Sequence, residues 1–252
     1  MSDIDRNDKT DFGYREVAPA EKTRLVRDVF ASVAPKYDLM NDLMSFGVHR
    51  LWKRWFVATS GVKRGDACLD LAGGTGDIAT LLAKAVGDAG SVVLTDINPA
   101  MLAVGRDRLV DRGIVRNVRT SLADASALPF ATARFDLVTI AFGLRNVTDK
   151  PAALREMRRV LRPGGRALVL EFTPDVAPPL KPLYDAFSFH VLPRLGKLVA
   201  NDEASYRYLA ESIRKHPPPD DLRRMMEEAG FARCSYDRMT GGVVAIHSGY
   251  AV

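Results

Sequence analysis

A glycine-rich loop in the first third of the chain has the composition of a nucleotide-cofactor site. The loop is Asp70–Asp77 (Asp-Leu-Ala-Gly-Gly-Thr-Gly-Asp), with a short apolar run before it and a helical pattern of apolar residues after it. In such a strand–loop–helix unit the glycines let the backbone approach a ligand closely, and the helix N-terminus offers free N–H groups. Asp70, Gly74, Thr75 and Gly76 are therefore candidate cofactor contacts.

The loop by itself fits two cofactors. Residues 74–79 match the G-x-G-x-x-A pattern of dinucleotide sites. Residues 70–76 match equally the acid-x-G-x-G-x-G loop that holds S-adenosylmethionine (SAM), with Ala72 in place of the first glycine. Asp96 ends a predicted strand about 20 residues beyond the loop, where a carboxylate accepts hydrogen bonds from the ribose of either cofactor. Asp96 is thus a candidate contact that does not discriminate.

Two later segments favour SAM. Asp124 and Ala125 follow a third predicted strand at 118–121, where the acid would face the adenine amino group and the next backbone N–H a ring nitrogen. The turn Leu161–Arg166 precedes a strand predicted at 167–172, as is typical of small-molecule methyltransferases. An ordinary turn aspartate and an ordinary helix stop would explain each segment singly. Their order along the chain favours SAM.

The elements that position these residues alternate between strands and helices. Such alternation predicts a parallel sheet with helices on both faces. The C-terminal part differs, because a helix at 220–229 precedes two strands at 232–239 and 243–250 that form a hairpin. A parallel sheet closed by a hairpin is the seven-stranded, Rossmann-like class I arrangement of SAM-dependent methyltransferases. The dinucleotide sheet has six parallel strands instead.

Three segments accompany this sheet domain, which we predict over residues 61–252. Residues 1–20 show no apolar periodicity and are expected to form a mobile N-terminal arm. Residues 21–60 show helical patterns interrupted by Pro35, which predicts an N-terminal helical cap. Residues 173–219, rich in aromatic residues and prolines, lie between the last parallel strand and the final helix. We expect them to form a lid over the substrate.

Composition restricts the compartment and the partners. The chain has 252 residues, of which 47% are hydrophobic and 27% charged, which suits one α/β domain with an appendage. No apolar stretch approaches the ~20 residues that span a bilayer, and Cys68 and Cys234 lie apart, as in proteins of a reducing compartment. The four histidines lack metal-ligand spacing, so we expect no metal. These features predict a cytoplasmic protein.

Several longer segments resemble one known family. Its strongest signals are Tyr37–Lys53 and Ala141–Asp149, which are far more specific than the glycine loop. Shorter matching segments are Leu170–Phe172, Tyr206–Ile213 and Leu222–Phe231. Together with the loop they resemble the ubiquinone/menaquinone biosynthesis C-methyltransferase (UbiE) family. The resemblance implies transfer of a methyl group from SAM to a ring carbon of a prenylated quinol.

The resemblance also carries over individual residues. Thr75, Asp96, Asp124 and Ala125 fall at SAM-contacting positions of the family. Ala141 ends the strand predicted at 135–141, where the family often has serine. Only a backbone contact to the cofactor is therefore expected at Ala141.

The chemistry points to two catalytic candidates. A hydroquinone that loses a hydroxyl proton gains electron density at the ortho carbon, so the enzyme must position the ring, exclude water and help the proton leave. Arg145 and Asn146 follow a strand at the sheet edge where parallel sheets bind ligands. We hypothesise that Arg145 stabilises the developing phenolate, directly or through a water, and that Asn146 orients the hydroxyl. Pairing of Arg145 with Asp149 is the structural alternative.

Three residues are candidates for substrate contact. Tyr37 and His49 come from the cap, and His49 has the chemistry of a proton shuttle, although a lone histidine beside aromatic residues is also an ordinary structural residue. Tyr206 would form or support the lid wall. Apolar residues of 187–199 would take the prenyl tail, and the basic-aromatic run Trp52–Phe56 offers a second lipid-facing patch.

The expected partners follow from this chemistry. We expect a prenylated hydroquinone substrate, no nucleic acid, and weak peripheral contact with the cytoplasmic face of the membrane. The net charge of +5 fits an anionic surface but also an ordinary solvated one. A homodimer and a complex of quinone-biosynthesis enzymes both stay open.

Other function classes are less consistent with the sequence. A SAM-dependent methyltransferase for another small molecule or for RNA would use the same loop, but no RNA-binding module is appended. An NAD-dependent oxidoreductase fits the loop and not the terminal hairpin or the Asp124 turn. A non-catalytic scaffold would not need the loop and Asp96 intact.

Overall fold

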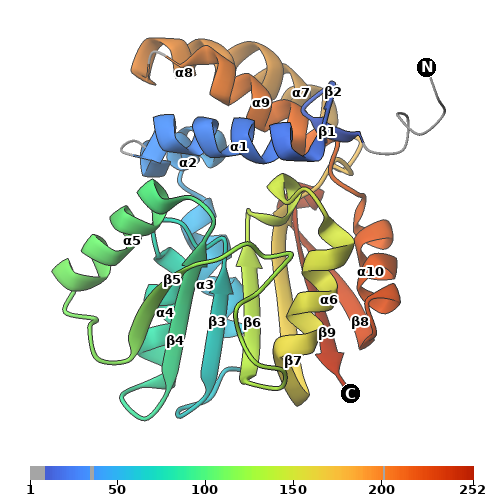
Figure 1. Cartoon of the computed structure of the whole chain (residues 1–252). Coiled ribbons are helices and arrows are strands. Elements are labelled where there is room, and N and C mark those ends of the chain that lie inside the picture. Colours follow the sequence, from blue (N-terminus) through green and yellow to red (C-terminus); the bar gives the residue numbers. More distant parts are fainter. Residues whose placement is uncertain (1–8, 35–36, 201) are drawn as a thin grey trace.

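A seven-stranded sheet forms the centre of the molecule and carries helices on both faces (Figure 1). The structure is a computed structural model that describes residues 9–34, 37–200 and 202–252. In spatial order the strands are β5 (Val118–Leu122), β4 (Ser91–Asp96), β3 (Ala67–Leu71), β6 (Phe135–Ala141), β7 (Leu161–Phe172), β9 (Val244–Ala251) and β8 (Phe231–Met239).

The strand register matches the predicted class I arrangement. Neighbouring strands from β5 to β7 pair in parallel, and β9 runs antiparallel to both β7 and β8. The C-terminal hairpin thus closes the sheet, as expected. One boundary differs from the prediction, because β7 begins at Leu161, which pairs with Phe135, and not at Ala167. The turn predicted at Leu161–Arg166 is therefore part of a bulged strand.

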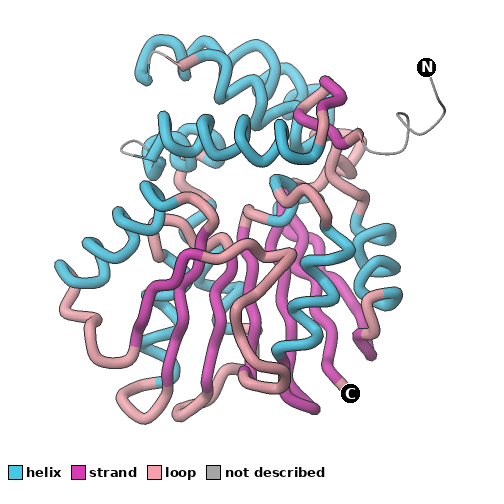
Figure 2. Tube along the Cα trace, viewed as in Figure 1, coloured by secondary structure: helices cyan, strands magenta, loops and turns pink. Residues whose placement is uncertain are grey.

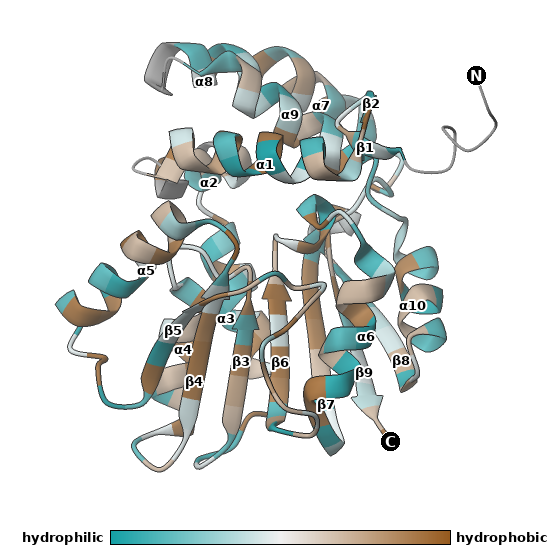
Figure 3. Cartoon of the chain, viewed as in Figure 1, coloured by the Kyte–Doolittle hydropathy of each residue, from teal (hydrophilic) through white to brown (hydrophobic). Residues whose placement is uncertain are grey.

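The core lies on both faces of the sheet. Most residues of the central strands are buried on both sides, as expected of parallel strands between helical layers, and Figure 3 shows these strands as the most hydrophobic part of the view. One face is packed by α3 (His49–Ala58) and α4 (Asp77–Val86), with Trp52, Phe56 and Leu82 in the core. The other is packed by α6 (Lys150–Val160) and α10 (Pro219–Glu228).

Two helical layers lie above the carboxyl ends of the parallel strands (Figures 1 and 2). The lower layer contains α1 (Pro19–Val33) and α2 (Tyr37–Ser45), while α5 (Pro99–Asp111) lies beside β4. The upper layer is the insertion, made of α7 (Lys181–Ala186), the π-helical turn η4 (Phe187–Val191), α8 (Leu192–Ala200) and α9 (Glu203–Arg214). The predicted lid is thus separated from the sheet by the cap helix α1.

The segment before α1 is partly regular, which differs from the arm predicted over residues 1–20. Residues 1–8 lie outside the described part. Strands β1 (Thr10–Phe12) and β2 (Arg15–Val17) form an antiparallel hairpin, and α1 begins already at Pro19. The ring of Phe12 stacks on Tyr208 of α9 with centroids 4.2 Å apart. Long-range packing of this kind orders a short hairpin that has too little apolar periodicity to be found in the sequence.

In the described part of the chain, no helix combines the length and the apolar character needed to cross a membrane.

Candidate active site

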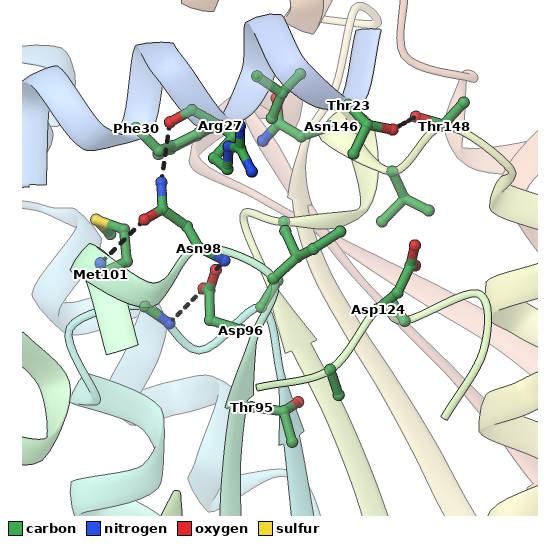
Figure 4. Close-up of a pocket in the computed structure, with 18 of the residues that line it drawn as sticks. Thr23, Arg27, Phe30, Thr95, Asp96, Asn98, Met101, Asp124, Asn146 and Thr148 are labelled. Atoms are coloured by element: carbon green, nitrogen blue, oxygen red, sulfur yellow. Dashed lines mark hydrogen bonds between the residues drawn. The ribbon is translucent and has the colours of Figure 1, made fainter. Parts of the chain in front are cut away.

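A cavity lies between α1 and the carboxyl ends of the parallel strands (Figure 4). We call it the strand-end cavity. Its empty space is about 860 Å³, counted with its open mouth. The sheet side contributes the glycine loop and the segments that follow β4, β5 and β6, and the cap contributes one face of α1. This is the edge at which parallel sheets bind ligands.

The glycine loop is tightly folded against its neighbours. Gly74 and Gly76 have φ of +52° and +80°, and Ala72, the one departure from glycine, also has a positive φ of +47°. A Cβ on Gly73 would lie 2.6 Å from Asp70 Oδ2, and one on Gly74 would lie 2.9 Å from Met101 Cε. Both the left-handed backbone and the close approach therefore require glycine here.

Asp96 ties the loop to the end of β4. Its Oδ2 accepts a hydrogen bond from the Gly74 N–H at 3.0 Å, and its Oδ1 accepts one from the Asn98 N–H at 2.8 Å. Burial raises the pKa of Asp96 to about 6, against the lowering effect of these N–H donors. Each carboxylate oxygen can accept a further hydrogen bond. Asp96 lines the strand-end cavity, so it is placed to receive ribose hydroxyls.

Asp124 and Ala125 line the wall opposite Asp96, as Figure 4 shows for Asp124. Asp124 Oδ1 accepts hydrogen bonds from the Ser126 N–H at 2.8 Å and the Ser126 hydroxyl at 2.6 Å. This aspartate-led turn holds the carboxylate at the cavity while leaving Oδ2 unused by these two bonds. The predicted position of an adenine-facing acid is therefore structurally available.

Four other predicted cofactor contacts lie behind the cavity wall: Asp70, Thr75, Gly76 and Ala141. Asp70 is fully buried, and its Oδ1 accepts a hydrogen bond from Thr139 Oγ1 at 2.9 Å. Its Oδ2 has no partner in the described chain, and burial raises its pKa to about 7. Ala141 pairs with Leu170 of β7. These residues shape the loop and the strand ends and do not line the cavity.

The two catalytic candidates point to different places. Both lie on the 3₁₀ turn η3 (Leu144–Asn146), which follows β6. Asn146 lines the strand-end cavity, and its Oδ1 accepts a hydrogen bond from the Tyr208 hydroxyl at 2.9 Å. Arg145 does not line this cavity; its Nη1 donates to Glu171 Oε1 at 2.7 Å and to the Phe142 carbonyl at 2.6 Å. In this geometry the Arg145 side chain therefore does not contact a ring bound in the strand-end cavity.

The alternative partner proposed for Arg145 is also wrong. Asp149 instead caps α6, where its Oδ1 accepts a hydrogen bond from the Ala152 N–H at 2.8 Å. The partner of Arg145 is Glu171, at the end of β7, which also accepts a hydrogen bond from the Arg145 backbone N–H at 3.2 Å. This pair is almost fully buried, with side-chain exposures of 3% and 1%.

Among the three substrate candidates, neither His49 nor Tyr206 lines the strand-end cavity. The His49 ring contacts Asp42 Oδ1 at 2.9 Å, and burial lowers the pKa of His49 below its usual range. Tyr206 is fully buried, and its ring packs closely against Gly196 of α8. Tyr37 begins α2, but its side chain lies outside the described residues.

Sequence reasoning missed the face of α1 that covers the cavity. Thr23, Val26, Arg27 and Phe30 line it with the i, i+3, i+4, i+7 spacing of one helical face. That spacing was visible in the cap pattern, but nothing local shows what the face covers. By contrast, no residue of the described part of 173–219 lines this cavity. The direct cover is α1, and the insertion lies one layer further out.

Two hydrogen bonds fasten α1 across the cavity (Figure 4). On one side Asn98, the N-cap of α5, accepts from the Ala100 and Met101 N–H groups and donates from Nδ2 to the Arg27 carbonyl at 2.9 Å. On the other side the hydroxyls of Thr23 and Thr148 lie 3.2 Å apart. Asn98 therefore has a second role that its capping pattern did not show.

The lining fits the chemistry of SAM. Two carboxylates face the cavity, and Phe30, Ile97, Met101 and Phe142 supply apolar surface. SAM has a cationic sulfonium, ribose hydroxyls and an adenine amino group, which such acceptors and apolar walls complement. Asp96 and Asp124 would hold the two polar ends of the nucleoside.

Comparison with known proteins decides the family. The model of the ubiE/COQ5 methyltransferase family matches residues 17–251. The chain belongs to this family. It is accordingly a SAM-dependent methyltransferase. The dinucleotide interpretation of the loop is thereby excluded.

Relatives and solved structures agree with this assignment. The chain is 63% identical over 246 residues to the ubiquinone/menaquinone biosynthesis C-methyltransferase UbiE of Xylella fastidiosa, covering 98% of this chain and 97% of the relative. It is 64% identical over 241 residues to the same enzyme of Stenotrophomonas maltophilia, covering 96% and 95%.

The solved structures share the fold at low identity. A SAM dependent methyltransferase from Aquifex aeolicus matches with a TM-score of 0.55 and 16% identity over 94% of this chain and all of the other. A possible histamine N-methyltransferase from Thermotoga maritima matches with a TM-score of 0.62 and 17% identity over 90% of this chain. The predicted methyltransferase fold is confirmed.

Proposed function

We propose that this enzyme methylates a ring carbon of a prenylated quinol in ubiquinone or menaquinone biosynthesis, the activity for which its relatives of 63–64% identity are named. One observation of the site carries the proposal. Among the described residues that line the strand-end cavity, none is a cysteine, histidine or lysine. A site without a thiol, imidazole or amine nucleophile suits an acceptor carbon that is already electron-rich, such as the carbon ortho to a phenolate.

The reaction then asks three things of the protein. When bound, SAM supplies an electrophilic methyl group, and the ring carbon forms its bond to this methyl as the sulfur–methyl bond breaks. The α1 face excludes water, and Asn146, fixed by the Tyr208 hydroxyl, orients the ring hydroxyl. The ring proton leaves last and restores aromaticity.

Arg145 acts in this proposal as a positioning residue. Its guanidinium and backbone N–H both bind Glu171, which fixes the turn that carries Asn146. We expect Arg145→Ala to lower kcat about 100-fold, the usual cost of misplacing a reacting group, with SAM affinity kept. Arg145→Lys, which keeps a cation opposite Glu171, recovers part of kcat. Wild-type turnover by folded Arg145→Ala would contradict the role.

The insertion borders the acceptor side of the site. Tyr208 belongs to α9, within the predicted lid at 173–219, and reaches Asn146 from above. The insertion therefore supports the residue that meets the acceptor, while α1 covers the donor. Tyr206, two residues before Tyr208 in α9, is buried within the insertion layer.

We further propose peripheral membrane contact on the cytoplasmic face, through large apolar side chains of α3 and α7 and of the turn that follows α2. Phe46 is 80% exposed, Leu183 74% and Trp55 56%. The predicted patch Trp52–Phe56 needs correction, because Trp52, Lys53 and Phe56 are buried in or beside the core. Phe46→Asp should reduce flotation with anionic liposomes, and Val115→Asp, a control at an exposed apolar residue between α5 and β5, should not.

A direct assay tests the acceptor. Purified enzyme receives SAM and a reduced demethylated benzoquinol or naphthoquinol, and mass spectrometry follows the methylated product. Asp96→Asn, which weakens the donor site, serves as the inactive control. SAM binding by calorimetry without methylation of either quinol would overturn the acceptor and leave the methyltransferase assignment intact. Light scattering during size-exclusion chromatography shows whether the enzyme is a homodimer or a monomer.

A further inference from the structure

A second cavity lies on the other side of η3 from the strand-end cavity. We call it the hairpin cavity, because β1 forms one wall; Lys22 of α1, Arg145, Lys150 of α6, and Tyr208 and Lys215 of α9 form the others. Its empty space is about 310 Å³, counted with its mouth. Four cationic side chains converge here from four different elements, and the methyl-transfer chemistry uses none of the lysines.

Two of the ammonium groups share a single neutral acceptor. Lys22 is only 2% exposed, and its Nζ contacts the Val147 carbonyl at 3.5 Å and Thr10 Oγ1 at 3.3 Å. Lys150 Nζ donates to the same Val147 carbonyl at 3.2 Å. Burial, and then repulsion from Lys150, lower the pKa of Lys22 to about 8, and burial also lowers the pKa of Lys150. Buried ammonium groups without a carboxylate partner are costly.

The carboxylates nearby are already engaged. Glu171 accepts hydrogen bonds from Arg145 through both oxygens and from the Phe172 N–H, so it raises the pKa of Lys150 only from a distance. Asp11 acts on both lysines but is half-exposed at the rim, where Lys215 lies 3.3 Å from it. His216, also buried here, has a pKa held well below its usual range by burial and by these cations, so it adds no charge.

Arg145 supplies a donor that nothing in the described chain accepts. Its Nε–H is buried without a hydrogen-bond partner, although the residue is only 5% exposed. The other polar groups of the wall are occupied, since the Tyr208 hydroxyl donates to Asn146 and the Ser212 hydroxyl donates to the Leu209 carbonyl. Among the described residues, the cavity therefore presents an unpaired donor and more cations than carboxylates, and neither Lys22 nor Lys150 has a hydrogen bond to a carboxylate.

We propose that the hairpin cavity binds a small inorganic oxyanion of the size of sulfate or phosphate, held by the ammonium groups of Lys22 and Lys150 and the Nε–H of Arg145. The oxygens of such an ion accept several charge-assisted hydrogen bonds at once, which matches donors that converge from three elements. The bound ion links α1 to η3 and α6 and stabilises the cap in its place over the strand-end cavity.

Sulfate is the most direct probe, because its charge does not change between about pH 6 and 9. Calorimetry and thermal unfolding of the full chain at pH 7 should show saturable binding of sulfate and a rise in Tm, beyond the effect of sodium chloride at equal ionic strength. Lys22→Met and Lys150→Met should each weaken sulfate binding about tenfold or more, as expected for loss of a charge-assisted bond. Lys84→Met, at an exposed site on α4, is the matched control and should bind as wild type.

The pH dependence has a definite sign. Lys22 binds the anion only when protonated, so sulfate affinity should fall as the pH rises through about 8. In Lys22→Met, sulfate affinity should fall much less as the pH rises. Methionine removes a buried charge, so the Lys22→Met variant is expected to fold. If it does not fold, Lys22→Gln replaces it in the binding assay. Selenate bound to wild-type crystals, located by anomalous scattering, then tests the same site.

Two results would overturn the proposal. One is equal stabilisation by sulfate and chloride at matched ionic strength, which is general screening. The other is wild-type sulfate affinity in folded Lys22→Met and Lys150→Met. Neither readout depends on turnover, so they are independent of the acceptor assay.

Discussion

The two cavities lie on either side of one short turn and have opposite character. The strand-end cavity is lined by two carboxylates, one arginine (Arg27) and apolar side chains, whereas the hairpin cavity is lined mainly by cations. Consecutive residues of η3 face the two cavities, with Asn146 on the first and Arg145 on the second. Charge therefore separates the sites, since one suits a cationic donor molecule and the other suits an anion.

The same turn couples the sites mechanically. Glu171 holds Arg145 from below, and Tyr208 holds Asn146 from above. Lys22 and Thr23 are neighbours on α1, and they contact the Val147 carbonyl and Thr148, just beyond the turn. A change in one cavity should therefore reach the other through residues 144–148. Four predictions test this, from the largest expected effect to the smallest.

Removal of the Arg145 side chain should have the largest effect on stability. Arg145→Met leaves Glu171 buried without its cation, which should lower the free energy of unfolding by about 3–5 kcal/mol. The double variant Arg145→Met/Glu171→Leu should recover most of the loss, because it removes both charges. Urea unfolding measures both. A double variant that is no more stable than the single one would show that the turn does not depend on this ion pair.

The buried acid beneath the glycine loop should make stability depend on pH. Burial raises the pKa of Asp70 from 3.8 to about 7, so the folded state holds the proton more tightly than the unfolded state. Stability from this group is therefore greatest below pH 3.8 and is lost as the pH rises to about 7.

Asp70→Asn removes this dependence while an amide oxygen still accepts from Thr139. The free energy of unfolding of Asp70→Asn, relative to that of the wild type, should increase from pH 5 to pH 8 and reach at most about 4 kcal/mol. Unfolding curves at both pH values measure it. Asp124→Asn, at an exposed acid that lines the strand-end cavity, is the control. An unchanged difference across this pH range would contradict the raised pKa.

A methyl group added beneath the loop should damage donor binding without touching the hairpin cavity. A Cβ on Gly105 of α5 would lie 2.4 Å from the Gly74 carbonyl oxygen, so Gly105→Ala must displace the loop. We expect a loss of about 1–3 kcal/mol in stability and a fall in SAM affinity, with sulfate affinity unchanged. Calorimetry with each ligand separates the two. Arg106→Ala, on the exposed side of the same helix, should change neither.

The smallest effect is expected where the insertion meets the turn. Tyr208→Phe removes the hydroxyl that donates to Asn146 and should cost about 0.5–1.5 kcal/mol in stability. It should lower kcat more than it raises KM for SAM, because the donor is held elsewhere. Steady-state kinetics tests this. A change in KM for SAM alone would place Tyr208 with the donor site and not with the acceptor.

Local patterns were sufficient where the chemistry is local. The strand before Asp70 and the strand that ends at Asp96 were both predicted, because alternation and glycine spacing depend on near neighbours. The hairpin at residues 10–17 was missed, because its order comes from packing on α9. The start of β7 was placed too late for the same reason, since Leu161 joins the strand only by pairing with Phe135.

The sequence by itself determined the sheet, the glycine loop and the family, because these depend on short-range spacing and on long matching segments. Only the tertiary structure decided which side chains share a cavity. Arg145 and Asn146 are adjacent in the chain, yet a buried carboxylate 26 residues away draws one of them to the opposite side of the turn. Likewise α1 lines the strand-end cavity and the described part of 173–219 does not, because Asn98 and Thr148 from distant elements hold α1 there.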